Sequence, residues 1–345
     1  MHPNLSRRAG LLLALLTLAP AALAWDYEGH RTVNQLALAS LPTNFPAFAL
    51  TPDARARIAF LAGEADRWRN TSDATFKNCS GPDHYLDLDD LKLYGLTPAT
   101  VSPFRYDFAA QLATARALHP KNFPPIDPVK DHDHTRALLG FLPWAINENY
   151  AKLQSAFSSL KTFEELGTPE EIANARQNAL YVMGVMGHYV GDAAQPLHTT
   201  KHHHGWVGEN PRRYATNYGF HAWIDGGFIG RTGLKTETML SQVRPARSLW
   251  AGKTNAPGTG SFPLILDYVG EQHQLVEPLY QMDKERKLSP NGPAVEEGKK
   301  FISGQLLKAG QMLGDLWFSA WQEATTDKFL HRELLKRKAA QETPP

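Results

Sequence analysis

The stretch TPEEIANARQNALYVMGVMGHYVGDAAQPLH, residues 168–198, decides the fold. It opens with a helix start signal, in which Thr168 stands at the N-cap, Pro169 at the first helical position and Glu171 three residues after the cap. The helix that follows is predicted to end near Pro196, because proline interrupts a helix. This segment therefore predicts one long helix with metal-binding types of side chain near its end.

Helical periodicity continues along the rest of the chain, whereas the alternation of Val, Ile and Thr that marks β-strands is scarce. We therefore expect an all-α fold in a single multi-helix domain over residues 25–327, followed by a basic C-terminal tail at 328–345. Further helices are predicted to begin near Glu28, after Pro52 and after Asp133, the last with a kink at Pro143, and to cover residues 213–228, 235–249, 263–280 and 294–325.

Residues 1–24 have the pattern of a secretory signal peptide. Arginines at positions 7 and 8 precede an apolar run at 11–18, and Ala22-Leu23-Ala24 provides a cleavage site. Cleavage there would leave Trp25 at the N-terminus of a secreted or periplasmic protein. The apolar run is short, and no later stretch reaches the roughly 18 apolar residues that a membrane-spanning helix needs, so no stable membrane insertion is expected.

The chain has no strong excess of either charge. Its 36 Lys and Arg oppose 35 Asp and Glu, and removal of residues 1–24 takes away two arginines, which moves the formal charge from +1 to −1. Affinity for duplex DNA depends on many contacts from basic residues to phosphates, so a nucleic-acid substrate would have to be held locally, by metals and stacking. The single cysteine, Cys79, excludes an internal disulfide. No protein partner is implied.

Histidine and aspartate recur at a helical spacing that suits a metal. His188 and Asp192 are four residues apart and so share a helix face, and His198 follows just past a proline. The same spacing returns at His221 and Asp225. A lone pair of this kind is often an ordinary ion pair, but two pairs with a histidine between them favour a zinc site of the catalytic type.

Three further residues are isolated candidates for metal ligands: His30, Asp66 and His84. Each lies near an apolar helix or a turn. Taken singly, each is better explained by a structural role.

In order along the chain, these motifs resemble the S-one/P-one family of zinc-dependent single-strand nucleases, whose helical fold and trinuclear site are shared with bacterial zinc-dependent phospholipase C. The segments that carry the resemblance are Trp25-Asp26-Tyr27-Glu28-Gly29-His30, Ala65-Asp66-Arg67-Trp68-Arg69, His84-Tyr85-Leu86-Asp87, His188 to His198, and His221 to Asp225. They extend from Trp25 to about Phe228.

The resemblance implies three Zn²⁺ ions. It assigns Asp66, His84, His188 and Asp192 to the first ion, His198, His221 and Asp225 to the second, and Trp25, His30 and the shared Asp192 to the third. In this family the tryptophan binds through its free α-amino group and its own carbonyl. Cleavage directly before Trp25 would then be a chemical requirement, because an amide nitrogen has no available lone pair.

The resemblance also implies two catalytic residues. Asp87 would orient the attacking water, and Arg69 would neutralise charge on the phosphoryl oxygens. The alternatives are an N-cap role for Asp87 and a solvated position at a helix end for Arg69.

Substrate recognition is where the chain departs from the nuclease pattern. The Gly-Gly-Asn segment typical of those nucleases is replaced by residues 203–210, and Ile224 stands where a tryptophan usually precedes the last aspartate. Four aromatic residues close to the ligands are candidates for stacking on bases, with core packing or acyl-chain contact as the alternatives: Trp206, Tyr214, Tyr218 and Phe220.

The remaining histidines are expected to have other roles. His202, His203 and His204 lie together just after a proposed ligand, and we expect them to be solvated. His132 and His134 are expected to cap the following helix.

The sequence thus predicts a secreted zinc-dependent phosphodiesterase, an endonuclease that hydrolyses single-stranded DNA or RNA to 5′-phosphate products. A zinc-dependent phospholipase C acting on phospholipid head groups is the alternative enzyme. A non-catalytic metal-binding helical protein is the alternative from another class, although the second ligand set, with only three protein ligands, leaves a position open for water or substrate.

Overall fold

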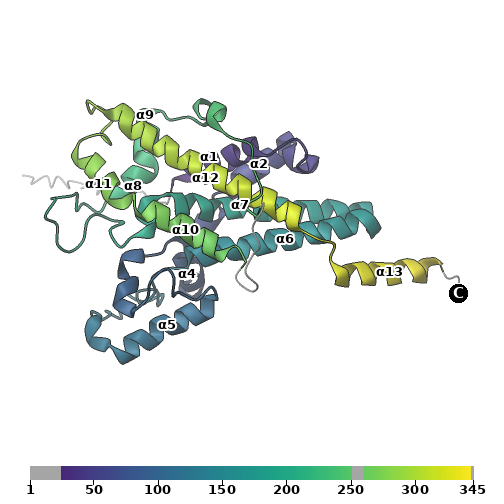
Figure 1. Ribbon diagram of the computed structural model, residues 1–345, viewed down its shortest axis with the longest axis horizontal. Helices are drawn as coiled ribbons and strands as arrows, with labels where there is room; N and C mark the ends of the chain where they lie inside the picture. Colours follow the sequence, from purple (N-terminus) through teal and green to yellow (C-terminus); the bar gives the residue numbers. More distant parts are fainter. Residues whose placement is uncertain (1–24, 251–259, 343–345) are drawn as a thin grey trace, which may run out of the picture.

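The computed structural model describes residues 25–250 and 260–342. Helices joined by turns and irregular segments make up this part of the chain, which contains no strand, so the prediction of an all-α single domain is confirmed there (Figure 1). The predicted signal peptide at 1–24 lies outside the described residues.

The α-helices are α1 (Tyr27–Ser40), α2 (Pro52–Leu61), α3 (Glu64–Arg69), α4 (Ala74–Ser80), α5 (Arg105–Leu118), α6 (Leu142–Leu166), α7 (Pro169–Ala194), α8 (Phe220–Ala222), α9 (Phe228–Thr232), α10 (Phe262–His273), α11 (Val276–Lys284), α12 (Val295–Glu323) and α13 (Lys328–Glu342). Short 3-10 helices lie between them at η1 (Ala47–Leu50), η2 (Gly81–His84), η3 (Leu88–Tyr94), η4 (Pro120–Asn122), η5 (Pro196–Thr199), η7 (Thr236–Thr238) and η8 (Leu240–Gln242), and η6 (Trp223–Gly227) is a π-helix.

Helix α7 is the centre of the fold, as Figure 1 shows. It packs on α6, with which it forms a hairpin, and also on α1, α2 and α12. Its start has the predicted geometry: the Thr168 hydroxyl accepts the N–H of Glu171 at 3.2 Å, and the Glu171 carboxylate accepts the N–H of Thr168 at 2.8 Å. This capping box satisfies two N–H groups that would otherwise lack a partner at the helix start.

Small residues on α7 allow its neighbours to approach closely. A Cβ atom added at Gly187 would lie 1.6 Å from Oδ1 of Asn34 on α1, so only glycine fits there. Asn34 is buried, and its amide donates to the carbonyls of Ile58 at 2.8 Å and Gly184 at 3.0 Å. These hydrogen bonds connect α1 to α2 and α7.

The prediction of a helix beginning after Asp133 is wrong. Residues 131–141 form turns, and α6 begins only at Leu142, with Pro143 in its first turn and therefore without a kink. Asp133 uses its carboxylate locally, accepting from the hydroxyl of Thr135 at 2.9 Å, which favours a turn over a helix.

Three other helix predictions fail in part. The helix predicted at 213–228 begins only at Phe220, because Asn210 holds the preceding loop through bonds to the N–H and carbonyl of Tyr214, at 2.8 and 2.9 Å. The helix predicted at 235–249 is reduced to the two short 3-10 turns η7 and η8, and Pro245 prevents its continuation. The helix predicted at 263–280 is divided into α10 and α11.

The C-terminal tail forms helix α13, which packs on α6 near the start of α7. Arg337 pairs with both carboxylate oxygens of Glu171, at 2.6 and 2.9 Å. The capping residue of the central helix is thereby linked to the tail.

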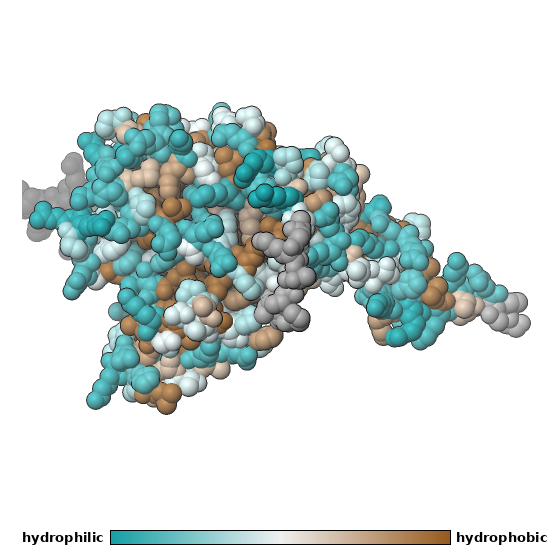
Figure 2. All heavy atoms as spheres, viewed as in Figure 1, coloured by the Kyte–Doolittle hydropathy of each residue, from teal (hydrophilic) through white to brown (hydrophobic). Residues whose placement is uncertain are grey.

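Among the described helices, none is both long and apolar enough to cross a membrane. On the face drawn in Figure 2, apolar side chains form patches between more extensive polar areas.

Candidate metal centre

Three groups of histidine and aspartate side chains are buried at the centre of the bundle, and each could hold a metal ion. The groups are His30, His188 and Asp192; Asp66, His84 and His188; and His198, His221 and Asp225. Eight of the nine predicted ligands, all except Trp25, are therefore brought together. Because His188 belongs to two groups, those two groups are adjacent.

The group of Asp66, His84 and His188 joins α3, η2 and α7. Nε2 of His188 lies 3.1 Å from Nδ1 of His84 and 3.8 Å from Oδ1 of Asp66. Oδ2 of Asp192 is 3.0 Å from Nδ1 of His84, so this carboxylate also borders the group. The four residues that the resemblance assigns to one ion therefore lie close together, while their binding of that ion stays a prediction.

The group of His30, His188 and Asp192 joins α1 to α7. Nε2 of His30 lies 3.4 Å from Oδ1 of Asp192, and the rings of His30 and His188 stack at 3.8 Å. Trp25 is fully buried beside this group, and its indole N–H donates to the carbonyl of Gly191 at 2.9 Å. The indole thus holds Trp25 next to Asp192, while binding through its α-amino group stays a prediction.

The group of His198, His221 and Asp225 joins η5 to α8 and η6. Nε2 of His221 lies 2.9 Å from Nε2 of His198 and 3.0 Å from Oδ2 of Asp225. Oδ1 of Asp225 accepts from the amide of buried Gln195 at 2.7 Å. Asp192 also lies near this group, with Oδ1 at 3.6 Å from Nδ1 of His198, so all three groups form one continuous cluster.

Backbone carbonyls orient two of the histidines. Nδ1 of His188 is 2.7 Å from the carbonyl of Ala62, and Nδ1 of His198 is 2.6 Å from the carbonyl of His84. A carbonyl only accepts, so Nδ1 carries the proton in both rings, and a neutral ring then has a free lone pair on Nε2. Both free Nε2 atoms point at the nitrogen of another histidine, an arrangement that a shared cation stabilises.

Burial lowers the pKa of four of the five clustered histidines, which favours metal binding, whereas Asp192 and Asp66 outweigh burial and raise the pKa of His188. Burial lowers the pKa of His84 to about 3, and burial together with the nearby His198 holds the pKa of His221 well below its usual value. Both rings are therefore neutral at pH 7, which is the form that binds a metal. Burial opposes ionisation of Asp192, but His198 and His188 outweigh it and keep the pKa of Asp192 low.

The donor set fits zinc. Neutral imidazole nitrogens and carboxylate oxygens are its usual ligands. Neither ring nitrogen of His30 makes a hydrogen bond within the described residues, and the same holds for Oδ1 of Asp192. Such buried atoms are costly unless they are paired, and bound zinc would pair them.

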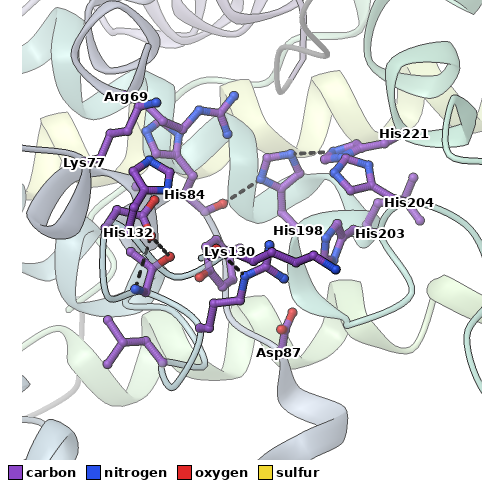
Figure 3. A pocket seen from close by; sticks show the side chains of 17 residues that line it. Arg69, Lys77, His84, Asp87, Lys130, His132, His198, His203, His204 and His221 are labelled. Carbon is purple, nitrogen blue, oxygen red and sulfur yellow. Dashed lines mark hydrogen bonds between the residues drawn. The ribbon is translucent and has the colours of Figure 1, made fainter. Parts of the chain in front are cut away.

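One cavity of about 560 Å³ opens over this cluster (Figure 3). His84, His198 and His221 contribute to its wall, together with Arg69 and Asp87. Nη2 of Arg69 pairs with Oδ1 of Asp66 at 3.0 Å, so this guanidinium lies beside a proposed ligand. The alternative considered from the sequence, a solvated arginine at a helix end, is therefore wrong, because the Arg69 guanidinium is paired with Asp66.

Asp87 is partly buried in the wall of the same cavity, and its Oδ1 atom is inaccessible to solvent. Burial, followed by the charges of Asp90 and Asp89, raises the pKa of Asp87 to about 8. Its side chain makes no N-cap bond to η3, and its Oδ1 has no hydrogen-bond partner within the described residues. The capping role considered from the sequence is therefore excluded, and the carboxyl group is available to a ligand.

The four candidate stacking residues are not brought together at the cavity. Tyr214 and Phe220 are buried in the core against Tyr280. Trp206 stacks on His202 at 4.0 Å. Only Tyr218 is exposed, at 73%, and it lies against His204 at 4.2 Å between ring centres. Their role in substrate binding stays a prediction.

The other histidines differ from expectation. His203 and His204 are half-buried in the cavity wall, and His202 is buried. The expectation that all three are solvated is wrong, because the loop folds back under Tyr280, whose hydroxyl donates to the carbonyl of His202. The predicted capping role of His132 and His134 is also wrong, because no helix begins directly after them and α6 starts only at Leu142. His132 instead lines the cavity.

Sequence reasoning missed three basic residues of the cavity wall, Lys77, Lys130 and Arg136. They come from α4 and from the connection between α5 and α6, and no local pattern links them. It also missed Gln195, although the position of this residue between two ligands was a usable signal.

The fold and the site define an all-α protein with three buried His/Asp clusters that could hold metal ions. Comparison with models of known families finds no match, and comparison with curated proteins finds none either.

Proposed function

We propose that the protein is a secreted or periplasmic zinc-dependent phosphodiesterase, an endonuclease that cleaves single-stranded DNA or RNA to 5′-phosphate products. One observation carries this proposal: three buried His/Asp groups adjoin one another beneath a single open cavity. The order of the ligands along the chain, similar to that of the S-one/P-one nucleases, supports it.

The ions would be held by the three groups, with Trp25 as the proposed ninth ligand residue. Bound zinc supplies positive charge for the phosphoryl oxygens and lowers the pKa of a water molecule from 15.7 toward about 7. A metal centre of this kind makes a protein nucleophile unnecessary.

The chain's own residues complete the site. Arg69 is fixed by its 3.0 Å contact with Asp66 and faces the cavity, where a guanidinium can bind two oxygens of a phosphodiester. Asp87 offers a buried carboxyl oxygen without a hydrogen-bond partner, which suits a residue that orients the attacking water. Gln195 and the carbonyl of Ala62 hold ligand side chains in place.

The test is a side-by-side assay of zinc-loaded protein on single-stranded DNA, RNA and phosphatidylcholine, with and without chelator. We expect hydrolysis of the nucleic acids, loss of the activity in chelator, and recovery on adding zinc. Hydrolysis of phosphatidylcholine alone would establish the phospholipase C alternative. Inactivity on all three, with zinc bound, would leave the non-catalytic alternative.

A further inference from the structure

One wall of the cavity carries basic side chains that the metal cluster does not use. Lys77 comes from α4, and Lys130, His132 and Arg136 come from the connection between α5 and α6. In Figure 3, Lys77 and His132 lie on the same side as Arg69. His203 and His204 lie on the other side, and Lys130 lies between the two groups. We call Lys77, Lys130 and Arg136 the basic wall.

The charge of the basic wall is largely uncompensated. Within the described residues, neither the ammonium group of Lys77 nor the guanidinium group of Arg136 forms an ion pair with a carboxylate. Lys130 has only a loose contact of 3.8 Å with Asp127, and both side chains are at least half exposed. Exposed pairs of this kind contribute little. By contrast, the chain as a whole carries a formal charge of only +1.

Hydrogen bonds hold the basic wall in place. Nε of Arg136 donates to the carbonyl of Lys130 at 3.0 Å, and the backbone N–H of Arg136 donates to Oδ1 of Asp131 at 3.0 Å. The amide of Asn78, next to Lys77, donates to the carbonyl of Asp133 at 2.9 Å. Helix α4 and the connection between α5 and α6 are therefore joined by hydrogen bonds, which hold their basic side chains at the same cavity.

From this arrangement we infer that the basic wall is a subsite for a second phosphate, one next to the phosphate that is cleaved. The inference rests on the proposed function and names its substrate class, a polyanionic strand with successive phosphates. Cationic side chains attract each phosphate of such a strand, whereas they repel the cationic choline of the zwitterionic phosphatidylcholine head group. The basic wall thus supplies locally the charge that the composition lacks.

The test compares a single-stranded tetranucleotide with bis(p-nitrophenyl) phosphate, which has one phosphate. The variants are Lys77→Gln, Arg136→Gln and the double variant. Each single change should lower kcat/KM for the tetranucleotide roughly 10-fold, the effect of losing one charged hydrogen bond. The loss for bis(p-nitrophenyl) phosphate should be several times smaller.

Lys121→Gln is the matched control. Lys121 is exposed on the same connection, and its replacement removes the same charge, but it does not line the cavity. This variant should keep the wild-type rate on both substrates. An equal loss in Lys121→Gln would show that overall charge, and not a subsite, is responsible, and would overturn the inference.

A binding measurement separates the subsite from the chemistry. We would follow the anisotropy of a labelled phosphorothioate tetranucleotide at several salt concentrations. The slope of log Kd against log salt should fall by about 0.7 to 1 for each charge removed from the basic wall. Unchanged slopes, or equal losses on both substrates, would overturn the inference.

If the wild-type protein hydrolyses neither substrate, the proposed function fails, and the salt slopes still decide the subsite. Faster hydrolysis of phosphatidylcholine than of the tetranucleotide, with no change in the variants, would overturn both.

Discussion

At Gly191 the backbone of α7 touches the ring of a proposed ligand. A Cβ atom added there would lie 2.7 Å from Nδ1 of His30, closer than real contacts allow. Because the carbonyl of Gly191 also accepts the indole N–H of Trp25, this one residue positions two ligands of the proposed third ion. Sequence spacing gave no sign of this role.

The substitution Gly191→Ala should therefore displace His30 and lower the zinc content by about one ion per chain. Elemental analysis checks this. The control is Gly304→Ala on α12, where an added methyl group meets no atom within 4 Å and should stabilise the helix by about 0.5 to 1 kcal/mol. Full zinc content in Gly191→Ala would show that His30 is not a ligand.

Arg69 is predicted to act on the substrate and not on the metal. Arg69→Ala should lower kcat/KM about 100-fold, the usual effect of removing a donor that stabilises developing charge. The zinc content should stay at the wild-type level, because Asp66 keeps its oxygen next to His188 without the arginine. Parallel loss of activity and of zinc would instead make Arg69 a positioning residue for Asp66.

At the scale of elements, the capping box of α7 supports the helix that carries His188 and Asp192. Thr168→Ala removes the hydroxyl that accepts the N–H of Glu171 and should lower the free energy of unfolding by about 1 kcal/mol. Denaturant unfolding measures this. Glu171→Gln keeps a side chain that can accept the reciprocal bond and removes the charge paired with Arg337, so its effect should be smaller. A larger loss in Glu171→Gln would place the stabilisation in the contact with α13.

What the sequence predicts at this scale depends on how local the signal is. The start of α7 was predicted because its cap, proline and glutamate lie within four residues, and the ligand pairs were predicted because a helix brings residues four apart together. The helix after Asp133 was not predictable, since local bonds of the Asp133 carboxylate compete with helical periodicity.

The basic wall was not predictable for a different reason. Lys77 and Arg136 are far apart in sequence and line one cavity because of tertiary contacts, among them the hydrogen bonds from the amide of Asn78 to the carbonyls of Asp133 and His134. The burial of the aromatic candidates was not predictable either, because closeness in sequence to a ligand does not distinguish buried Tyr214 from exposed Tyr218.

At the scale of the molecule, bound metal should stabilise the whole fold. The three groups take their side chains from α1, α3, α7 and η2, and also from η5, α8 and η6, so bound ions would join segments from residue 30 to residue 225. A ligand that binds only the folded state raises its stability. Chelation should therefore lower the melting temperature by several degrees in a scanning experiment, and re-addition of zinc should restore it. An unchanged melting temperature would mean that the buried groups are stable without metal.

We propose that three zinc ions lie in the buried His/Asp cluster. An anomalous difference map from crystals of the zinc-loaded protein, with data collected at the zinc absorption edge, tests this proposal most directly. Three peaks are expected, one at Asp66, His84 and His188, one at His198, His221 and Asp225, and one at His30 and Asp192. A map without peaks among these side chains would contradict the proposal.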